Sequence, residues 1–175
     1  MITVLALGAG ILLNAGCSRH KKVKRGKGRP AAVAYRVTGG RVAELHGGVA
    51  YAPSGAPVEV KRAIAAANRI AGLPYKWGGG HARLNDSGYD CSGAASYVLR
   101  NAGLLEDQMP SRGFLKYGKR GAGKWITVYA RKGHVYLVIA GLRFDTQGTT
   151  TQDGPRWRTA PRKAKGHTRR HPPGL

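Results

Sequence analysis

Apolar residues recur at helical spacing in two separate stretches of the chain. In residues 56–72 the apolar positions lie three or four residues apart, at Val60, Ile64, Ala67 and Ile70. Pro57 suits the first turn of a helix and Gly72 suits its end. The spacing predicts an amphipathic helix of about four turns that opens the folded domain.

A second helical pattern follows over residues 92–102. Its apolar face consists mainly of small residues: Ala94, Ala95, Val98 and Leu99. Gly103 stands where a helix commonly ends. A face lined by small side chains predicts close packing against a sheet.

Three runs rich in β-branched and aromatic residues follow, at 124–130, 134–140 and 142–147. The short segments between them predict an antiparallel meander. The expected fold class is therefore α+β, with N-terminal helices packed on an antiparallel sheet. Residues 73–90 lie between the two helices and show no regular spacing of apolar residues. A long loop of this kind is more typical of a functional site than of a spacer.

Charge divides the chain further. Its 175 residues carry a formal charge of +22, and seven cations lie within residues 19–29 alone. Basic runs of this kind are typically solvated and disordered. We therefore expect four parts: a signal or lipoprotein-like segment (1–17), a basic flexible linker with room for a short strand or two (18–56), one domain (57–158) and a basic disordered tail (159–175).

The N-terminal segment is a short apolar run that ends at Cys17. It is shorter than the roughly 20 residues of a spanning helix and fits an export signal. The sequence around Cys17 is similar to a bacterial lipobox, although Asn14 replaces the usual Leu and no cation precedes the run. Three alternatives stay open: a lipid-anchored envelope protein, an unlipidated secreted protein, and an incidental apolar terminus.

Cys91, at the start of the second helix, is the candidate nucleophile. If Cys17 is lipidated, Cys91 has no disulfide partner. A helix N-terminus and a nearby imidazolium both lower the pKa of a thiol, so we expect a lowered pKa here. Ser92 and Gly93 would let substrate approach the N-terminal amides as an oxyanion site. Asp90 either binds a substrate amine or caps the helix.

His134 is the candidate base. Four of the six histidines lie in the biased segments, which leaves His81 and His134 in the domain. His134 opens a predicted strand at the rim of the sheet, where it could reach a thiol at a helix start. His81 lies in the loop before Cys91 and could line the cleft.

Strand register selects the residue that would orient His134. If Ala140 and Gly141 form a two-residue turn, Gln147 faces His134, Asp145 shares its face, and Thr146 points away. A three-residue turn would reverse this choice. We favour Asp145, since a carboxylate fixes the tautomer and stabilises an imidazolium; a cap at the strand end is the alternative.

Three blocks carry a family resemblance: "PYKWGGG" at 74–80, "YDCSGAASYVLRNAG" at 89–103 and "GHVYLVIAGLRFDTQG" at 133–148. In this order and spacing they resemble the NlpC-type cell-wall peptidases, a branch of the papain-like cysteine hydrolases. The resemblance covers roughly residues 57–157.

The resemblance implies hydrolysis of amide bonds in peptidoglycan stem peptides, commonly between D-glutamate and the diamino acid, without metal or cofactor. Cys91 matches the nucleophile and His134 the base, while the third position falls between 145 and 147. Tyr75 would lie over the thiol and Trp77 would support its loop. We expect substrate contacts from Tyr75, Asp90, Ser92, Gly93 and Gln147.

Rival functions remain to be compared with this one. An inactive wall-binding module, holding anionic wall polymer through basic tails, shares the same features. An amidase or acyltransferase would use the same Cys-His pair. A nucleic-acid binder is disfavoured, because the N-terminus suits export and the tails carry much of the charge. We expect a monomer in the bacterial cell envelope.

Overall fold

The structure is a computed structural model that describes residue 40, residues 42–148 and residues 152–175. The expected export signal, Cys17 and the first part of the basic linker lie outside the described residues.

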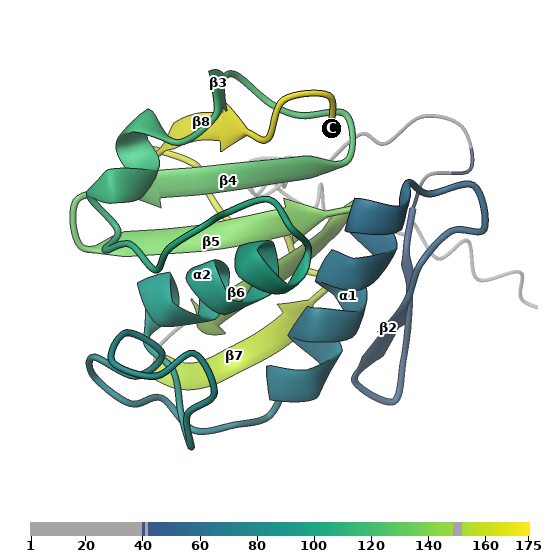
Figure 1. Cartoon of the computed structure of the whole chain (residues 1–175). Helices are drawn as coiled ribbons and strands as arrows, with labels where there is room; N and C mark the ends of the chain where they lie inside the picture. Colours follow the sequence, from purple (N-terminus) through teal and green to yellow (C-terminus); the bar gives the residue numbers. More distant parts are fainter. Residues whose placement is uncertain (1–39, 41, 149–151) are drawn as a thin grey trace, which may run out of the picture. The chain divides into compact units, whose positions relative to one another are not determined.

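Two helices pack on one face of an antiparallel sheet (Figure 1). Helix α1 spans Val58–Ile70 and helix α2 spans Cys91–Asn101, each within two residues of its predicted bounds. Their apolar stripes are buried, as the periodicity predicts: Val60, Ile64, Ala67 and Ile70 on α1, and Ala94, Ala95, Val98 and Leu99 on α2. The α+β fold class is confirmed.

The sheet has six strands in the order β3-β8-β4-β5-β6-β7. The strands are β3 (Lys119–Arg120), β4 (Ile126–Arg131), β5 (His134–Ile139), β6 (Leu142–Gln147), β7 (Gln152–Arg158) and β8 (Thr168–His171). A short 3-10 turn, η1 (Gly113–Lys116), precedes β3. Strands β4 to β7 follow one another as a meander, and β8 returns to pair between β3 and β4.

The turn between β5 and β6 sets the register of the site. Ala140 and Gly141 both have positive φ, 45° and 83°, as a type I′ turn requires. Ile139 consequently pairs with Leu142, and Leu137 pairs with Phe144. The two-residue register is confirmed, so Asp145 and His134 lie on the same face of the sheet.

The sheet has a second buried face, which the helices do not cover. Tyr129, Tyr136 and Val138 form a small cluster there, and Ala164 packs against it. The rings of Tyr129 and Tyr136 stack with centroids 4.7 Å apart. This face explains why every residue of β5 is buried.

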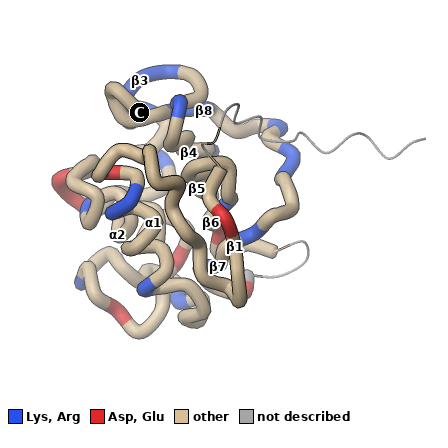
Figure 2. The backbone as a smooth tube through the Cα atoms, turned by 90° about the vertical axis from the view of Figure 1, so that its right-hand side faces the viewer, with Lys and Arg blue, Asp and Glu red and all other residues tan. Residues whose placement is uncertain are grey.

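The C-terminal segment is ordered, in contrast to the disordered tail that its composition predicts. After β7 the chain crosses the second face and forms β8, which pairs with β4 and β3. Arg170 donates to the carbonyls of Tyr117 and Gly118, at 2.6 and 2.7 Å. Part of the charge read as a solvated tail therefore serves the fold, and Figure 2 shows Lys and Arg along β3 and β8.

The domain also begins earlier than residue 57. Within the expected linker, β1 (Glu44–His46) and β2 (Val49–Tyr51) form a hairpin. The hairpin is held to α1 by Asn68, whose side chain exchanges hydrogen bonds with the backbone of Ala50 at 2.8 and 3.0 Å. Ala43 donates to the carbonyl of Ala140 at 2.8 Å. Residues 42–56 are thus part of the domain.

Among the described residues, none of the helices combines the length and the apolar character needed to cross a membrane.

Candidate active site

Cys91 is the first residue of α2, and Asp90 caps the helix. The Asp90 carboxylate accepts a hydrogen bond from the backbone N–H of Gly93 at 2.7 Å. This is the usual N-cap contact, which satisfies an amide that the helix leaves unpaired. The cap fixes the thiol in the first turn of the helix.

Asp90 has little capacity left for a substrate amine. Its Oδ1 also accepts from the Ser92 hydroxyl at 3.0 Å and lies 3.1 Å from His81 Nε2. Its Oδ2 accepts from the N–H of Gly78 at 3.2 Å. Of the two roles considered for Asp90, these contacts favour the cap.

Gly93 packs against backbone and does not face a cleft. A Cβ at this position would overlap the carbonyl of Gly79 and approach the Cα of Gly80. The amide of Gly93 is already bound by Asp90. This corrects the expectation that Ser92 and Gly93 open the helix start to substrate, since Ser92 is buried and bonded to Asp90 as well.

The loop before Cys91 is held by its own polar contacts. Asp86 accepts from Lys76 Nζ at 2.6 Å and from the N–H of Gly80 at 3.2 Å. The hydrogen bond from Lys76, together with those from Gly80 and Ser87, lowers the pKa of Asp86 to about 2. The loop is therefore an ordered wall beside the start of α2.

The Cys91 thiol lies at the start of β5. The backbone N–H of Val135, the residue next to His134, acts on the thiol and favours a lower pKa. Burial raises the pKa of the thiol above its ordinary value, and the charges of Asp90 and Asp145 raise it further against the opposing N–H groups of Val135 and Ser92. The expectation of a lowered pKa for the Cys91 thiol is therefore corrected, because the effect of burial is larger than that of the N–H groups around the sulfur.

His134 is paired with Asp145. The imidazole Nε2 lies 3.1 Å from Asp145 Oδ1, and both side chains are buried. The register of β5 and β6 places them on one face, as described above. The pair meets the distance of an ion pair, but its geometry does not form a hydrogen bond at Nε2.

Asp145 collects further donors around its buried carboxylate. Arg143 and Arg162 each approach Oδ2 at 3.2 Å, and the N–H of Gln147 donates to Oδ1 at 2.9 Å. Burial by itself would raise the pKa of Asp145, but His134, Gln147 and Arg162 together hold it below its ordinary value. The carboxylate therefore stabilises the fold at neutral pH, and this stabilisation is lost as the pH falls through its lowered pKa.

Two residues of the C-terminal segment reach this pair, and the sequence did not indicate either of them. Arg162 contacts Asp145, and the ring of His167 lies 6.1 Å from that of His134. Burial lowers the pKa of His167, and the charges of His134, Arg131 and Arg162 add to this effect. The only available signal was the need of a buried carboxylate for cationic partners.

Of the other residues expected near the Cys91 thiol, only some lie close to it. Burial raises the pKa of Tyr75, and the charges of Cys91 and Asp90 raise it further, so the phenol lies within electrostatic range of the thiol. Gln147 instead directs Oε1 to Arg162 at 2.6 Å. Trp77 is 86% exposed and does not support the loop as expected.

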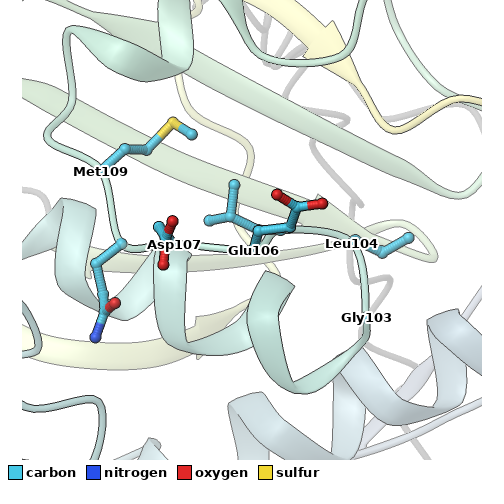
Figure 3. A pocket seen from close by; sticks show the side chains of 7 residues that line it. Gly103, Leu104, Glu106, Asp107 and Met109 are labelled. Carbon is cyan, nitrogen blue, oxygen red and sulfur yellow. The ribbon is translucent and has the colours of Figure 1, made fainter.

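A hollow lies along the segment that follows α2 and contacts its side at Ser96. It has a volume of about 730 Å³ and is lined by residues 103–109, several of which Figure 3 shows as sticks. Among the described residues no cluster of three His, Cys, Asp or Glu side chains could hold a metal ion.

Comparison with known proteins gives matches among solved structures only. No family model and no curated protein matches the chain. The peptidoglycan hydrolase RipB from Mycobacterium tuberculosis matches with 22% identity over 65% of this chain and 64% of its own, at a TM-score of 0.49. The chain is structurally similar to this peptidoglycan hydrolase.

A mutated form of the Resuscitation Promoting Factor Interacting protein RipA matches with 19% identity over 74% of this chain and 72% of its own, at a TM-score of 0.48. A hypothetical invasion protein of Mycobacterium tuberculosis matches with 19% identity over 74% and 71%, at 0.47. The match covers less than two thirds of the length of RipB.

Replacing Gly93 by Ala should destabilise the fold by about 2 kcal/mol, because the new methyl group overlaps the Gly79 carbonyl. Gly55→Ala is the matched control, since nothing lies within 4 Å of a Cβ there. Urea unfolding of both variants measures the difference. Equal stability of the two variants would contradict the close approach of loop and helix.

The raised pKa of Cys91 predicts an alkaline profile of thiol reactivity. The rate of iodoacetamide alkylation should rise with pH, with a midpoint above that of an ordinary thiol, about 8.5. Mass analysis of the peptide that contains Cys91 measures the rate separately from Cys17. A midpoint below the ordinary value would mean that His134 already holds a thiolate at rest.

Proposed function

We propose that the chain is an exported cysteine peptidase that hydrolyses amide bonds in peptidoglycan stem peptides. The supporting observation is the arrangement at the start of β5: the backbone N–H of Val135 acts on the pKa of the Cys91 thiol, and the preceding residue, His134, lies 3.1 Å from the buried Asp145. A nucleophile, a base and an orienting group are the parts that acyl transfer needs.

In the proposed mechanism, Asp145 holds the proton of His134 on Nε2 and leaves Nδ1 as the base. Because the pKa of Cys91 is raised, the thiol is protonated at rest and transfers its proton to His134 as the sulfur attacks the carbonyl carbon. The positive charge then formed on the imidazole is stabilised by the Asp145 carboxylate.

The oxyanion of the tetrahedral intermediate is assigned to the backbone N–H of Cys91. The amide of Gly93 is bound to Asp90 and that of Ser92 faces the sulfur, whereas the first amide of a helix has no partner within it. His134 returns its proton to the leaving amine as the C–N bond breaks. Water, deprotonated by His134, then attacks the thioester and releases the thiol.

The substrate follows from the sequence resemblance and agrees with the similarity to RipB. The bond between D-glutamate and the diamino acid is the favoured target. Such a substrate requires action outside the cytoplasm, in line with the apolar N-terminus and with either fate of Cys17. Exposed cations of β3 and β8 would face an anionic wall favourably.

Digestion of purified peptidoglycan followed by mass analysis of the released fragments tests this function. The wild-type protein should release peptide fragments cut at one type of amide bond, and Cys91→Ala and His134→Ala should each reduce the rate by at least about a thousandfold. Lys163→Ala, an exposed change, serves as the control for handling.

The fragments also distinguish the alternatives. Cleavage between glycan and peptide would indicate an amidase, and peptides joined to a new amine would indicate an acyltransferase. Identical profiles from wild type and Cys91→Ala, with both proteins still sedimenting with the wall, would replace the peptidase by a wall-binding module.

A further inference from the structure

Arg162 reaches the site from a segment outside the meander. Its Nη1 donates to Asp145 Oδ2 at 3.2 Å, and its Nη2 donates to Gln147 Oε1 at 2.6 Å. The guanidinium carbon also lies 5.9 Å from the centroid of the Tyr136 ring. Arg162 thus bridges two residues at the end of β6, and its side chain is only 21% exposed.

The segment that carries Arg162 is fixed on both sides of the contact. On its N-terminal side it continues from β7, and on its C-terminal side Ala164 packs against Tyr129 and Tyr136. The ring of His167 lies 5.3 Å from that of Tyr136, and β8 follows directly. The guanidinium is therefore presented by an ordered backbone.

The two carboxylate oxygens of Asp145 contact different groups. Oδ1 contacts His134 Nε2 and accepts from the N–H of Gln147. Oδ2 contacts Arg143 and Arg162. Arg143 belongs to the same strand as Asp145, whereas Arg162 ties the carboxylate to an independent part of the chain and resists its rotation away from His134.

Several charged and titratable groups face this carboxylate. They are His134 on β5, Arg143 on β6, Arg162 on the C-terminal segment, Cys91 on α2, whose pKa responds to Asp145, and His167 behind His134. Arg143 is shielded within the sheet, with 5% of its side chain exposed. Arg162 is the cation that a substitution can remove without opening the interior of the sheet.

We propose that Arg162 is a positioning residue for the His134–Asp145 pair, which makes the C-terminal segment part of the active site. Its catalytic consequence rests on the proposed peptidase function; its effect on the pair does not. The planar guanidinium matters as well as the charge, because one N–H group serves Asp145 while another serves Gln147.

The test compares Arg162→Ala, Arg162→Lys and the neighbouring exposed change Lys163→Ala. For Arg162→Ala, kcat per competent site should fall on the order of tenfold with KM unchanged. Competent sites are counted by stoichiometric alkylation of Cys91. Arg162→Lys should recover part of the loss, and Lys163→Ala should match the wild type.

Two further readouts separate positioning from folding. The acid limb of the kcat/KM profile should move to higher pH in Arg162→Ala, because the Arg162 charge helps to lower the pKa of Asp145. The rate of Cys91 alkylation at pH 7 should fall in the same order of variants, and this rate needs no peptidoglycan. It therefore tests Arg162 even if the wild type cuts no wall.

Any of three results overturns the proposal. Arg162→Ala could equal the wild type in both kcat and alkylation rate. It could also have fewer competent sites with an unchanged kcat per site, which would indicate a purely structural role. A loss of equal size in Lys163→Ala would point to general surface charge.

Discussion

A buried carboxylate organises the candidate site. The side chain of Asp145 has no exposed surface, and an ionised group in such a place is tolerated only when charges and donors surround it. Its partners come from β5, from β6 itself and from the segment before β8. The same contacts that make the charge tolerable also fix the imidazole of His134 and the path of the C-terminal segment.

The thiol of Cys91 is positioned by the N-terminus of α2 and not by Asp145. Asp90 caps α2, and the backbone of Gly79 and Gly80 lies so close to the helix that a Cβ at Gly93 would overlap it. Cys91 at this helix start is partly buried, and burial raises the pKa of its thiol. A thiol with a raised pKa needs a base that accepts its proton during attack, which is the role proposed above for His134.

The spacing of apolar residues and the turn sequence predicted the helices and the hairpin, because these elements depend mainly on residues close together in the chain. Periodicity located both helices, and the Ala140-Gly141 turn fixed the register that places Asp145 beside His134. Composition misled the interpretation of residues 159–175, because strand β8 contains two arginines, and Arg170 binds carbonyls near Tyr117, about fifty residues away. Arg162 and the burial of Cys91 depend on such distant contacts, which neither spacing nor residue type reveals.

In the proposed mechanism, Asp145 holds the proton of the His134 imidazole on Nε2 and leaves Nδ1 to act as the base. Nitrogen-15 NMR of the imidazole ring tests this claim directly, since protonated and unprotonated ring nitrogens differ strongly in chemical shift. We expect His134 to be the Nε2–H tautomer in the wild type and to lose this preference in Asp145→Ala. A wild-type His134 with its proton on Nδ1 would contradict the account.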